Sequence, residues 1–146
     1  MNAETPIVTG TAICSVRAAT VFVDNPERAL QFYVDKLGFE QRADVELDGG
    51  LRWTEVAPAN AAVALVLVHP SLTTMGAERA SWARQRIGEP TGVVLETEDV
   101  EAAYRELRAR GVEFTGGPAP HAWGAAAATF RDPDGNEFLL VEASRT

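Results

Sequence analysis

Cysteine and histidine, the side chains that most often bind transition metals, are scarce in this sequence. Its 146 residues include a single cysteine, Cys14, and two histidines, His69 and His121. One cysteine excludes an intramolecular disulfide and any metal site built from several cysteines. A metal site in this chain would therefore depend on carboxylates. Such sparing use of cysteine is typical of a reducing compartment, so we expect a cytoplasmic location.

Positive charge is also scarce, and no apolar run is long. Thirteen basic residues stand against twenty-one acidic ones, which gives a net charge of -8. This charge repels nucleic-acid phosphates and anionic lipids, so we expect neither nucleic acid nor a membrane as a partner. The longest apolar run, residues 61–68, is far shorter than the roughly 20 residues of a transmembrane helix. Residues 1–12 are polar and are expected to form a flexible tail.

The chain does have enough apolar sequence for one core, since 46% of its residues are hydrophobic and 23% charged. Ile13–Val23 is rich in β-branched residues and predicts a strand. Asn25-Pro26 predicts the start of a helix, which apolar residues at three- and four-residue spacing extend to about Leu37. Three further strands are expected at Phe39–Leu47, Leu51–Val56 and Ala62–Val68.

The same order returns in the second half, where Asp24–Ala29 is matched by Glu98–Ala103. Three more strands follow a predicted strand at Gly92–Thr97 and a helix that ends at Gly111. They are expected near Glu113–Thr115, Ala125–Arg131 and Glu137–Glu142, and the loop Asp132–Asn136 predicts a hairpin between the last two. Residues 13–70 and 91–146 are thus expected to form two βαβββ modules, joined by a linker, residues 71–90, with a helix from about Thr74 to Ile87.

Four segments carry a resemblance to a known family: Val21–Asp24, Ala29–Tyr33, Leu37–Phe39 and Phe130–Asn136. They resemble the vicinal oxygen chelate superfamily, which includes glyoxalase I, extradiol dioxygenases and bleomycin resistance proteins, and the resemblance spans about Ile13–Glu142. It implies an α+β fold in which two paired βαβββ modules form a curved, partly closed mixed sheet with helices outside. A ligand pocket between the modules and a homodimer are also implied. The scaffold hosts both enzymes and binding proteins, so function must be argued from the site.

Metal-using members carry a ligand on the first and fourth strands of each module, and the resemblance places these positions at Ala18, Val66, Gly92 and Leu139. None of these side chains can bind a metal, and a shift by one residue brings in only Thr91, a weak donor. We therefore predict no cofactor. A divalent metal would require an atypical site built from His69, His121, Glu55, Glu96 or Glu142. Small and apolar residues at the ligand positions favour an apolar, aromatic or otherwise bulky ligand.

Strand alternation predicts which other side chains share that face. The expected pocket residues are Ala18, Thr20, Phe22, Trp53, Glu55, Val66, Gly92, Val94, Glu96, Trp123 and Leu139. Glu96 in a dry cleft would have a raised pKa and could act as an acid or base, with Glu55 and His121 as weaker candidates. The alternatives are a solvated Glu96 at the rim and tryptophans that pack in the core. Cys14 is expected to be a buried small hydrophobe.

Two functions follow from these patterns. The first is a metal-independent protein that binds and sequesters a small molecule, as in the bleomycin resistance branch. The second is an enzyme of the glyoxalase or dioxygenase type, a lyase or isomerase, that uses Glu96 or Glu55 or an atypical metal site. A third possibility is that the concave face serves oligomerisation.

Overall fold

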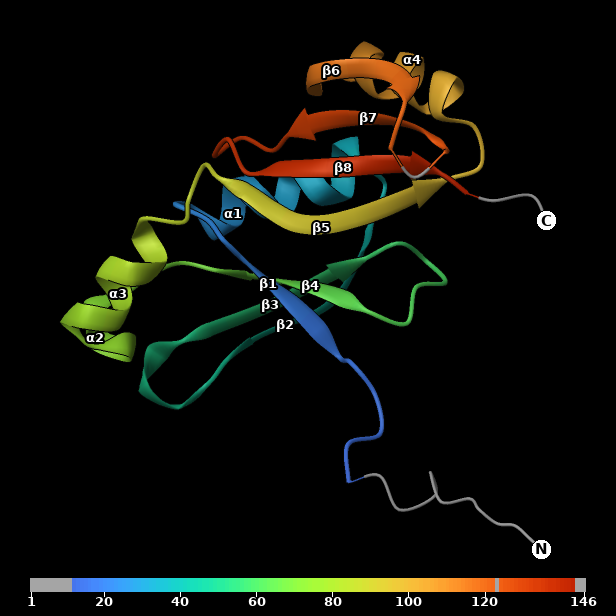
Figure 1. The fold of residues 1–146 in the computed structure, drawn as a ribbon. Helices are drawn as coiled ribbons and strands as arrows, with labels where there is room; N and C mark the ends of the chain where they lie inside the picture. The colour runs from blue at the N-terminus through green and yellow to red at the C-terminus, as the bar shows by residue number, and fades with distance from the viewer. Residues whose placement is uncertain (1–11, 123, 144–146) are drawn as a thin grey trace, which may run out of the picture.

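The structure, a computed structural model, describes residues 12–122 and 124–143. The first module contains β1 (Ala18–Phe22), α1 (Pro26–Gln31), the π-helical turn η2 (Phe32–Lys36), β2 (Glu40–Glu46), the short turn η3 (Asp48–Gly50), β3 (Arg52–Ala57) and β4 (Ala64–Val68). The second contains β5 (Pro90–Thr97), α4 (Val100–Ala109), β6 (Glu113–Pro120), β7 (Ala126–Arg131) and β8 (Glu137–Glu142). Between them lie α2 (Leu72–Met75) and α3 (Ala77–Arg84), at one side of the molecule (Figure 1).

Each module forms its own four-stranded mixed sheet, and the two have the same topology. The strand orders are β1-β4-β3-β2 and β5-β8-β7-β6, with β1 parallel to β4 and β5 parallel to β8. The predicted α+β fold of two βαβββ modules is therefore confirmed. In the described residues the two sheets stay separate and do not join into one partly closed sheet, and both β1 and β5 lie at an open edge.

Local capping explains where the two main helices begin. The Oδ1 atom of Asn25 accepts hydrogen bonds from the backbone N–H groups of Glu27 and Arg28, at 3.0 and 3.1 Å. Asp99 plays the same part for α4 and accepts from the N–H of Ala102 at 3.0 Å. The predicted hairpin between β7 and β8 is also present, with Gly135 at φ +85°.

Three local predictions were wrong. The linker helix is broken into α2 and α3 at Gly76, whose φ of +83° does not continue a helix. The first strand begins at Ala18 because its pairing with β4 begins there, so residues 13–17 lie outside the sheet and Cys14 is exposed rather than buried. Strand β6 extends to Pro120, further than expected, through register shifts on both sides of Gly116.

One face of each sheet contributes to a common core, and we call these the core faces. They are represented by Val21, Leu65 and Leu67 in the first sheet and by Phe130, Phe138 and Leu140 in the second. Ala29, Phe32 and Tyr33 belong to the same core cluster, and Figure 1 shows α1 behind β5 and β8. The opposite faces, which we call the outer faces, therefore point away from the common core.

A buried hydrogen-bond network joins the modules beside this core. Tyr33 donates its hydroxyl to Asp132 Oδ2 at 2.8 Å, and Asn136 Nδ2 donates to the same oxygen and to the carbonyl of Phe22, both at 2.9 Å. Asn136 Oδ1 accepts from the N–H of Gly88 at 2.8 Å. The network crosses between modules twice, at Tyr33 and at Phe22, and so sets their relative orientation.

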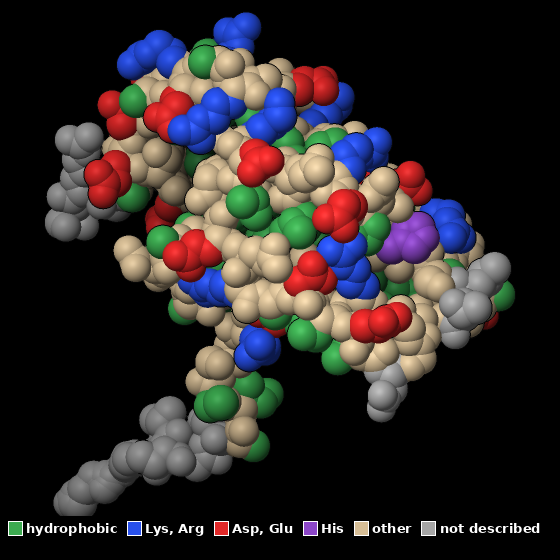
Figure 2. Space-filling model, turned by 180° about the vertical axis from the view of Figure 1, so that it is seen from behind, with side chains coloured by type: hydrophobic (Ala, Val, Ile, Leu, Met, Phe, Trp, Pro, Cys, Tyr) green, Lys and Arg blue, Asp and Glu red, His purple; other side chains and the backbone are tan. Residues whose placement is uncertain are grey.

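The exterior is mixed in charge. On the side opposite that of Figure 1, acidic and basic side chains are interspersed without a large field of one sign (Figure 2). Within the described residues, no helix has the length and apolar character needed to cross a membrane.

Candidate ligand-binding site

The outer face of the first sheet presents a tryptophan held by a carboxylate. Trp53 and Glu55 lie two residues apart on β3, so their side chains share a face. Trp53 Nε1 donates to Glu55 Oε2 at 2.6 Å, and Arg17 Nη2 reaches the same oxygen at 3.1 Å. Cross-strand pairing places Val66 beside Glu55 and Thr20 beside Val66. The structure thus brings together the predicted pocket residues of the first module.

The electrostatics of Glu55 favour a permanent anion. Only 4% of the residue is exposed. The hydrogen bond from Trp53 lowers its pKa most, and the hydrogen bond and charge of Arg17 lower it further, against the opposing effect of burial. A carboxyl group with a lowered pKa is a poor proton donor or acceptor near neutral pH. The hydrogen bond from Trp53 Nε1 to this carboxylate fixes the orientation of the indole ring.

The linker adds an aromatic residue that the sequence analysis did not select. Trp82 of α3 is 48% exposed and meets Phe22 edge to face, with ring centroids 5.8 Å apart. Arg86 lies over the Trp82 ring at 4.0 Å. Phe22 is on the outer face of β1, so the aromatic surface extends from the first sheet onto α3. Trp82 has no periodic pattern that marks it, since α3 carries its apolar residues on no single stripe.

The outer face of the second sheet is more aliphatic. Val94, 43% exposed, is directly opposite Leu139, and Glu96 is opposite Val141. Ala127 on β7 pairs with Val141 and keeps this face flat. Further along, Thr115 and Thr129 share a hydrogen bond at 2.8 Å, and Thr115 also donates to Glu137 at 3.1 Å. Glu96 is exposed, as the rim alternative predicted.

The residues at the family's metal-ligand positions do not fit a metal. The pairing puts Thr20 opposite Val66 and Val94 opposite Leu139. Ala18 precedes Thr20 by two residues on β1, so it lies on the same face. Gly92, with φ +77°, sits within a register shift of β5. Apart from the Thr20 hydroxyl, these side chains offer no oxygen, nitrogen or sulfur donor. Among the described residues, no three His, Cys, Asp or Glu side chains gather as a metal site would require.

In the part of the chain that the structure describes, the grooves between the modules include few residues of the outer faces. The grooves between the modules are lined from the core-face side, by Ala19, Leu65, Val93 and Leu95 among others. Of the predicted pocket residues that the structure describes, only Val94 and Glu96 line these grooves. Grooves do lie between the halves, as expected, but most of the predicted pocket residues are on the outer faces and do not line them.

The remaining candidates lie apart from the outer faces. His69 Nδ1 is 3.4 Å from the carbonyl of Val23, and the backbone N–H of His121 is bonded to the carbonyl of Ala125. Glu142 Oε1 accepts from the N–H of Val100 at 3.1 Å and so supports the start of α4. Trp123 lies outside the described residues.

Comparison with known proteins agrees with this fold. Residues 15–140 match the family model of the Glyoxalase/Bleomycin resistance protein/Dioxygenase superfamily. The chain is 34% identical to the uncharacterized protein YetH of Bacillus subtilis, over 89% of this chain and 99% of YetH. It is also similar to a solved member of the superfamily from Sphaerobacter thermophilus, with 40% identity, a TM-score of 0.79 and coverage of 91% of this chain and 100% of that one. TnmS3, described as an antibiotic binding protein from a Streptomyces species, is 35% identical with a TM-score of 0.72, over 92% of this chain and 99% of TnmS3. The chain therefore belongs to the Glyoxalase/Bleomycin resistance protein/Dioxygenase superfamily.

Proposed function

We propose that this protein binds and sequesters a small apolar or aromatic molecule without a metal. The observation that carries the proposal is the Trp53 ring, which is held in place by Glu55 on an outer face where Glu55 is paired with Arg17. A ring fixed before the ligand arrives loses little conformational entropy on binding. The similarity to TnmS3, an antibiotic binding protein, supports a ligand of this kind.

We further propose that the complete site forms in a homodimer. The outer faces of one chain point away from its core, so in a dimer the first sheet of one copy would face the second sheet of the other. The open edges of β1 and β5 and the exposed Val94 leave room for this approach. The pocket would then have an aromatic wall at Phe22 and Trp53 and an aliphatic wall at Val94 and Leu139.

An enzyme is the weaker alternative. Glu55 has a lowered pKa, and the ligand positions lack metal donors. Glu96 is the remaining candidate base, at the exposed end of β5. If any turnover were found, unchanged turnover in Glu96→Ala would exclude that residue from the mechanism.

Binding of a planar aromatic probe, 1-aminoanthracene, tests the proposed site. We expect Trp53→Ala to raise the Kd about three- to tenfold, the range measured for loss of one aromatic contact, and Trp53→Phe to restore most of the affinity. Tyr104→Leu, an aromatic change on α4 away from the outer faces, is the matched control and should leave the Kd unchanged. Equal affinity in Trp53→Ala and the parent protein would contradict the proposal.

Two further measurements test the metal and the dimer. Elemental analysis after dialysis should find no stoichiometric divalent metal, and about one ion per chain would overturn that part of the proposal. Sedimentation should give a dimer that Val94→Arg dissociates, because a charge would be buried without a partner. The control Glu101→Arg, on an exposed position of α4, should remain dimeric.

A further inference from the structure

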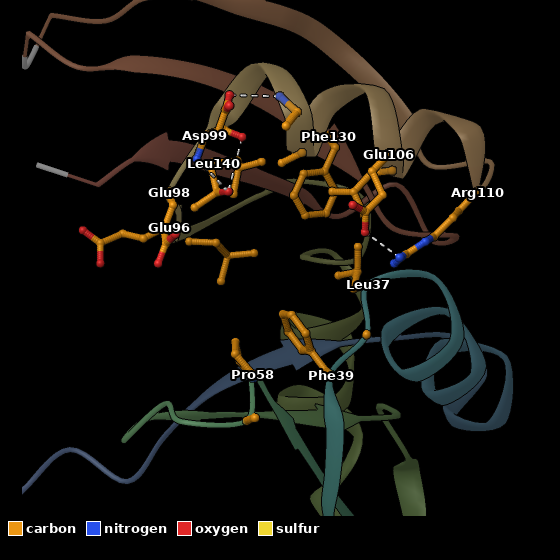
Figure 3. Close-up of a pocket in the computed structure, with 17 residues that line it drawn as sticks. Leu37, Phe39, Pro58, Glu96, Glu98, Asp99, Glu106, Arg110, Phe130 and Leu140 are labelled. Atoms are coloured by element: carbon orange, nitrogen blue, oxygen red, sulfur yellow. Dashed lines mark hydrogen bonds and ion pairs between the residues drawn. The ribbon is translucent and has the colours of Figure 1, made fainter. Parts of the chain in front are cut away.

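A groove of about 470 Å³ lies between the two modules, apart from the aromatic wall described above. Figure 3 shows Phe130 and Leu140 on one side of it and Phe39 and Pro58 on the other, with open space between. Helix α4 contributes Ala103 and Leu107. The volume is within the range of about 300–1,000 Å³ that is usual for small-molecule pockets.

The walls of the groove are apolar and incompletely covered. Leu37, Phe39, Leu95 and Leu107 pack against the core, yet each keeps part of its surface in contact with water. Covering such surface is favourable in proportion to the apolar area removed from water. Binding of an apolar group between Phe39 and Leu107 would therefore be favourable.

The rim of the groove is acidic. It carries Glu96, Glu98, Asp99 and Glu106, and Arg110 is its one cationic residue. The Arg110 guanidinium is already occupied, because Nη2 pairs with Glu106 and Nη1 donates to the carbonyl of Lys36 at 2.9 Å. Asp99 caps α4.

Glu96 and Glu98 differ from Glu106, which is paired with Arg110, and from Asp99, which caps α4. Neither forms an ion pair with any residue that the structure describes. Figure 3 shows both at the same end of the groove, beside Leu140 and opposite the Arg110 end, with one of the two side chains extending outward, away from Phe39 and Phe130. The apolar slot thus ends in two carboxylates that no arginine or lysine in the described residues neutralises.

We propose that this groove is a second binding site, for small amphiphilic cations. The apolar part of the ligand lies between the Phe39 and Leu107 walls, and its protonated amine lies beside Glu96 and Glu98. The rim repels an anion of the same shape, and the net charge of -8 raises the local concentration of cations. The site is separate from the aromatic wall of the proposed function, so either can fail without the other.

Calorimetry with the full-length protein and 4-phenylbutylammonium as the probe tests the site, with 4-phenylbutyrate as its anionic counterpart. We expect the ammonium to bind at least tenfold more tightly than the carboxylate and to weaken as salt rises from about 0.01 to about 1 M. The double variant Glu96→Gln/Glu98→Gln should raise its Kd about five- to twentyfold, from two ion pairs of modest strength. Glu101→Gln makes the same kind of charge change on α4 outside the groove and should have less than a twofold effect.

A shape variant makes the test independent of charge. Ala103→Phe places a ring in the groove and should abolish binding of the ammonium while the circular dichroism spectrum and the 1-aminoanthracene affinity stay unchanged. Equal binding of ammonium and carboxylate, or equal effects of the groove variants and Glu101→Gln, would overturn the proposal. So would absence of binding in the parent protein.

Discussion

Replacing Tyr33 by Phe should weaken the junction between the modules without disturbing the packing of the core. Tyr33 is fully buried, and its ring contacts Phe32, Phe39 and Phe138 at centroid distances of 5.2, 6.0 and 6.0 Å. Phenylalanine keeps these contacts. What is lost is the 2.8 Å hydrogen bond from the hydroxyl to Asp132 Oδ2, one of the links that cross between modules.

The expected magnitude follows from what remains around Asp132. A hydrogen bond to a charged group contributes about 1.5–3 kcal/mol. Asp132 keeps its donors at Asn136 Nδ2 and at the backbone N–H groups of Asp134 and Asn136, each at 2.9 Å. The carboxylate is therefore not left without partners, and we expect a loss near the lower end, about 1.5 kcal/mol in the free energy of unfolding.

The same substitution should change the pH dependence of stability. Burial, followed by the nearby charge of Asp132, raises the pKa of Tyr33 well above its usual value of about 10. A group with a raised pKa in the folded state stabilises the fold fully below its unfolded pKa and loses that contribution as pH rises. Stability of the parent protein should therefore fall above about pH 10, and Tyr33→Phe should remove the part that belongs to Tyr33.

Urea unfolding at neutral pH and above pH 10 measures both effects. Tyr104→Phe is the matched control, because the only other tyrosine accepts an exposed hydrogen bond from Arg108 on the same helix. It should cost less than about 0.5 kcal/mol. The reasoning is refuted if Tyr33→Phe costs no more than Tyr104→Phe, or if its stability above pH 10 falls as steeply as in the parent protein.

Two further substitutions test the network and a surface ion pair. Asn136→Ala removes hydrogen bonds to Phe22, Gly88 and Asp132 from a site that is 1% exposed, so unfolding in urea should show a loss of about 2–4 kcal/mol, and a loss below 1 kcal/mol would contradict the network's role. Arg52→Ala removes two hydrogen bonds to Asp44, at 2.9 and 2.7 Å, and one to Glu27 at 2.9 Å, and should cost at most about 1 kcal/mol because these pairs are partly exposed. The Arg52 hydrogen bond lowers the pKa of Asp44, so this contribution is present at neutral pH and lost in acid, and an NMR titration should show a higher Asp44 pKa in the variant.

Most of the fold could be predicted because its signals are local. The cap at Asn25, the hairpin at Asp132–Asn136 and the order of strands each depend on a few neighbouring residues. The break at Gly76 escaped prediction because an isolated glycine is tolerated in many helices. Cys14 was placed wrongly because a strand ends where its partner ends, and that partner, β4, is about fifty residues away in the chain.

The candidate site could be predicted only in part, for a physical reason. A period of two residues determines which side chains share a face, so Thr20 and Val66, or Val94 and Leu139, were correctly grouped. It does not determine which way that face turns. The orientation depends on α1 and η2, which share the core with both sheets, with Tyr33 of η2 in contact with Phe138 of the second sheet.

The residues that stabilise the fold are different from those of the proposed binding site. The residues that hold the modules together, such as Tyr33 and Asn136, are buried on the core side, whereas Trp53 and Val94 lie on outer faces that the monomer does not need for its core. Outer-face variants should therefore change ligand affinity or dimerisation with little effect on the unfolding of the chain, and junction variants should do the reverse. Glu55 is the exception worth measuring, since it is buried, ionised and bonded to Trp53. Removing its charge would leave the indole N–H without its acceptor, so Glu55→Leu should loosen the ring and weaken binding.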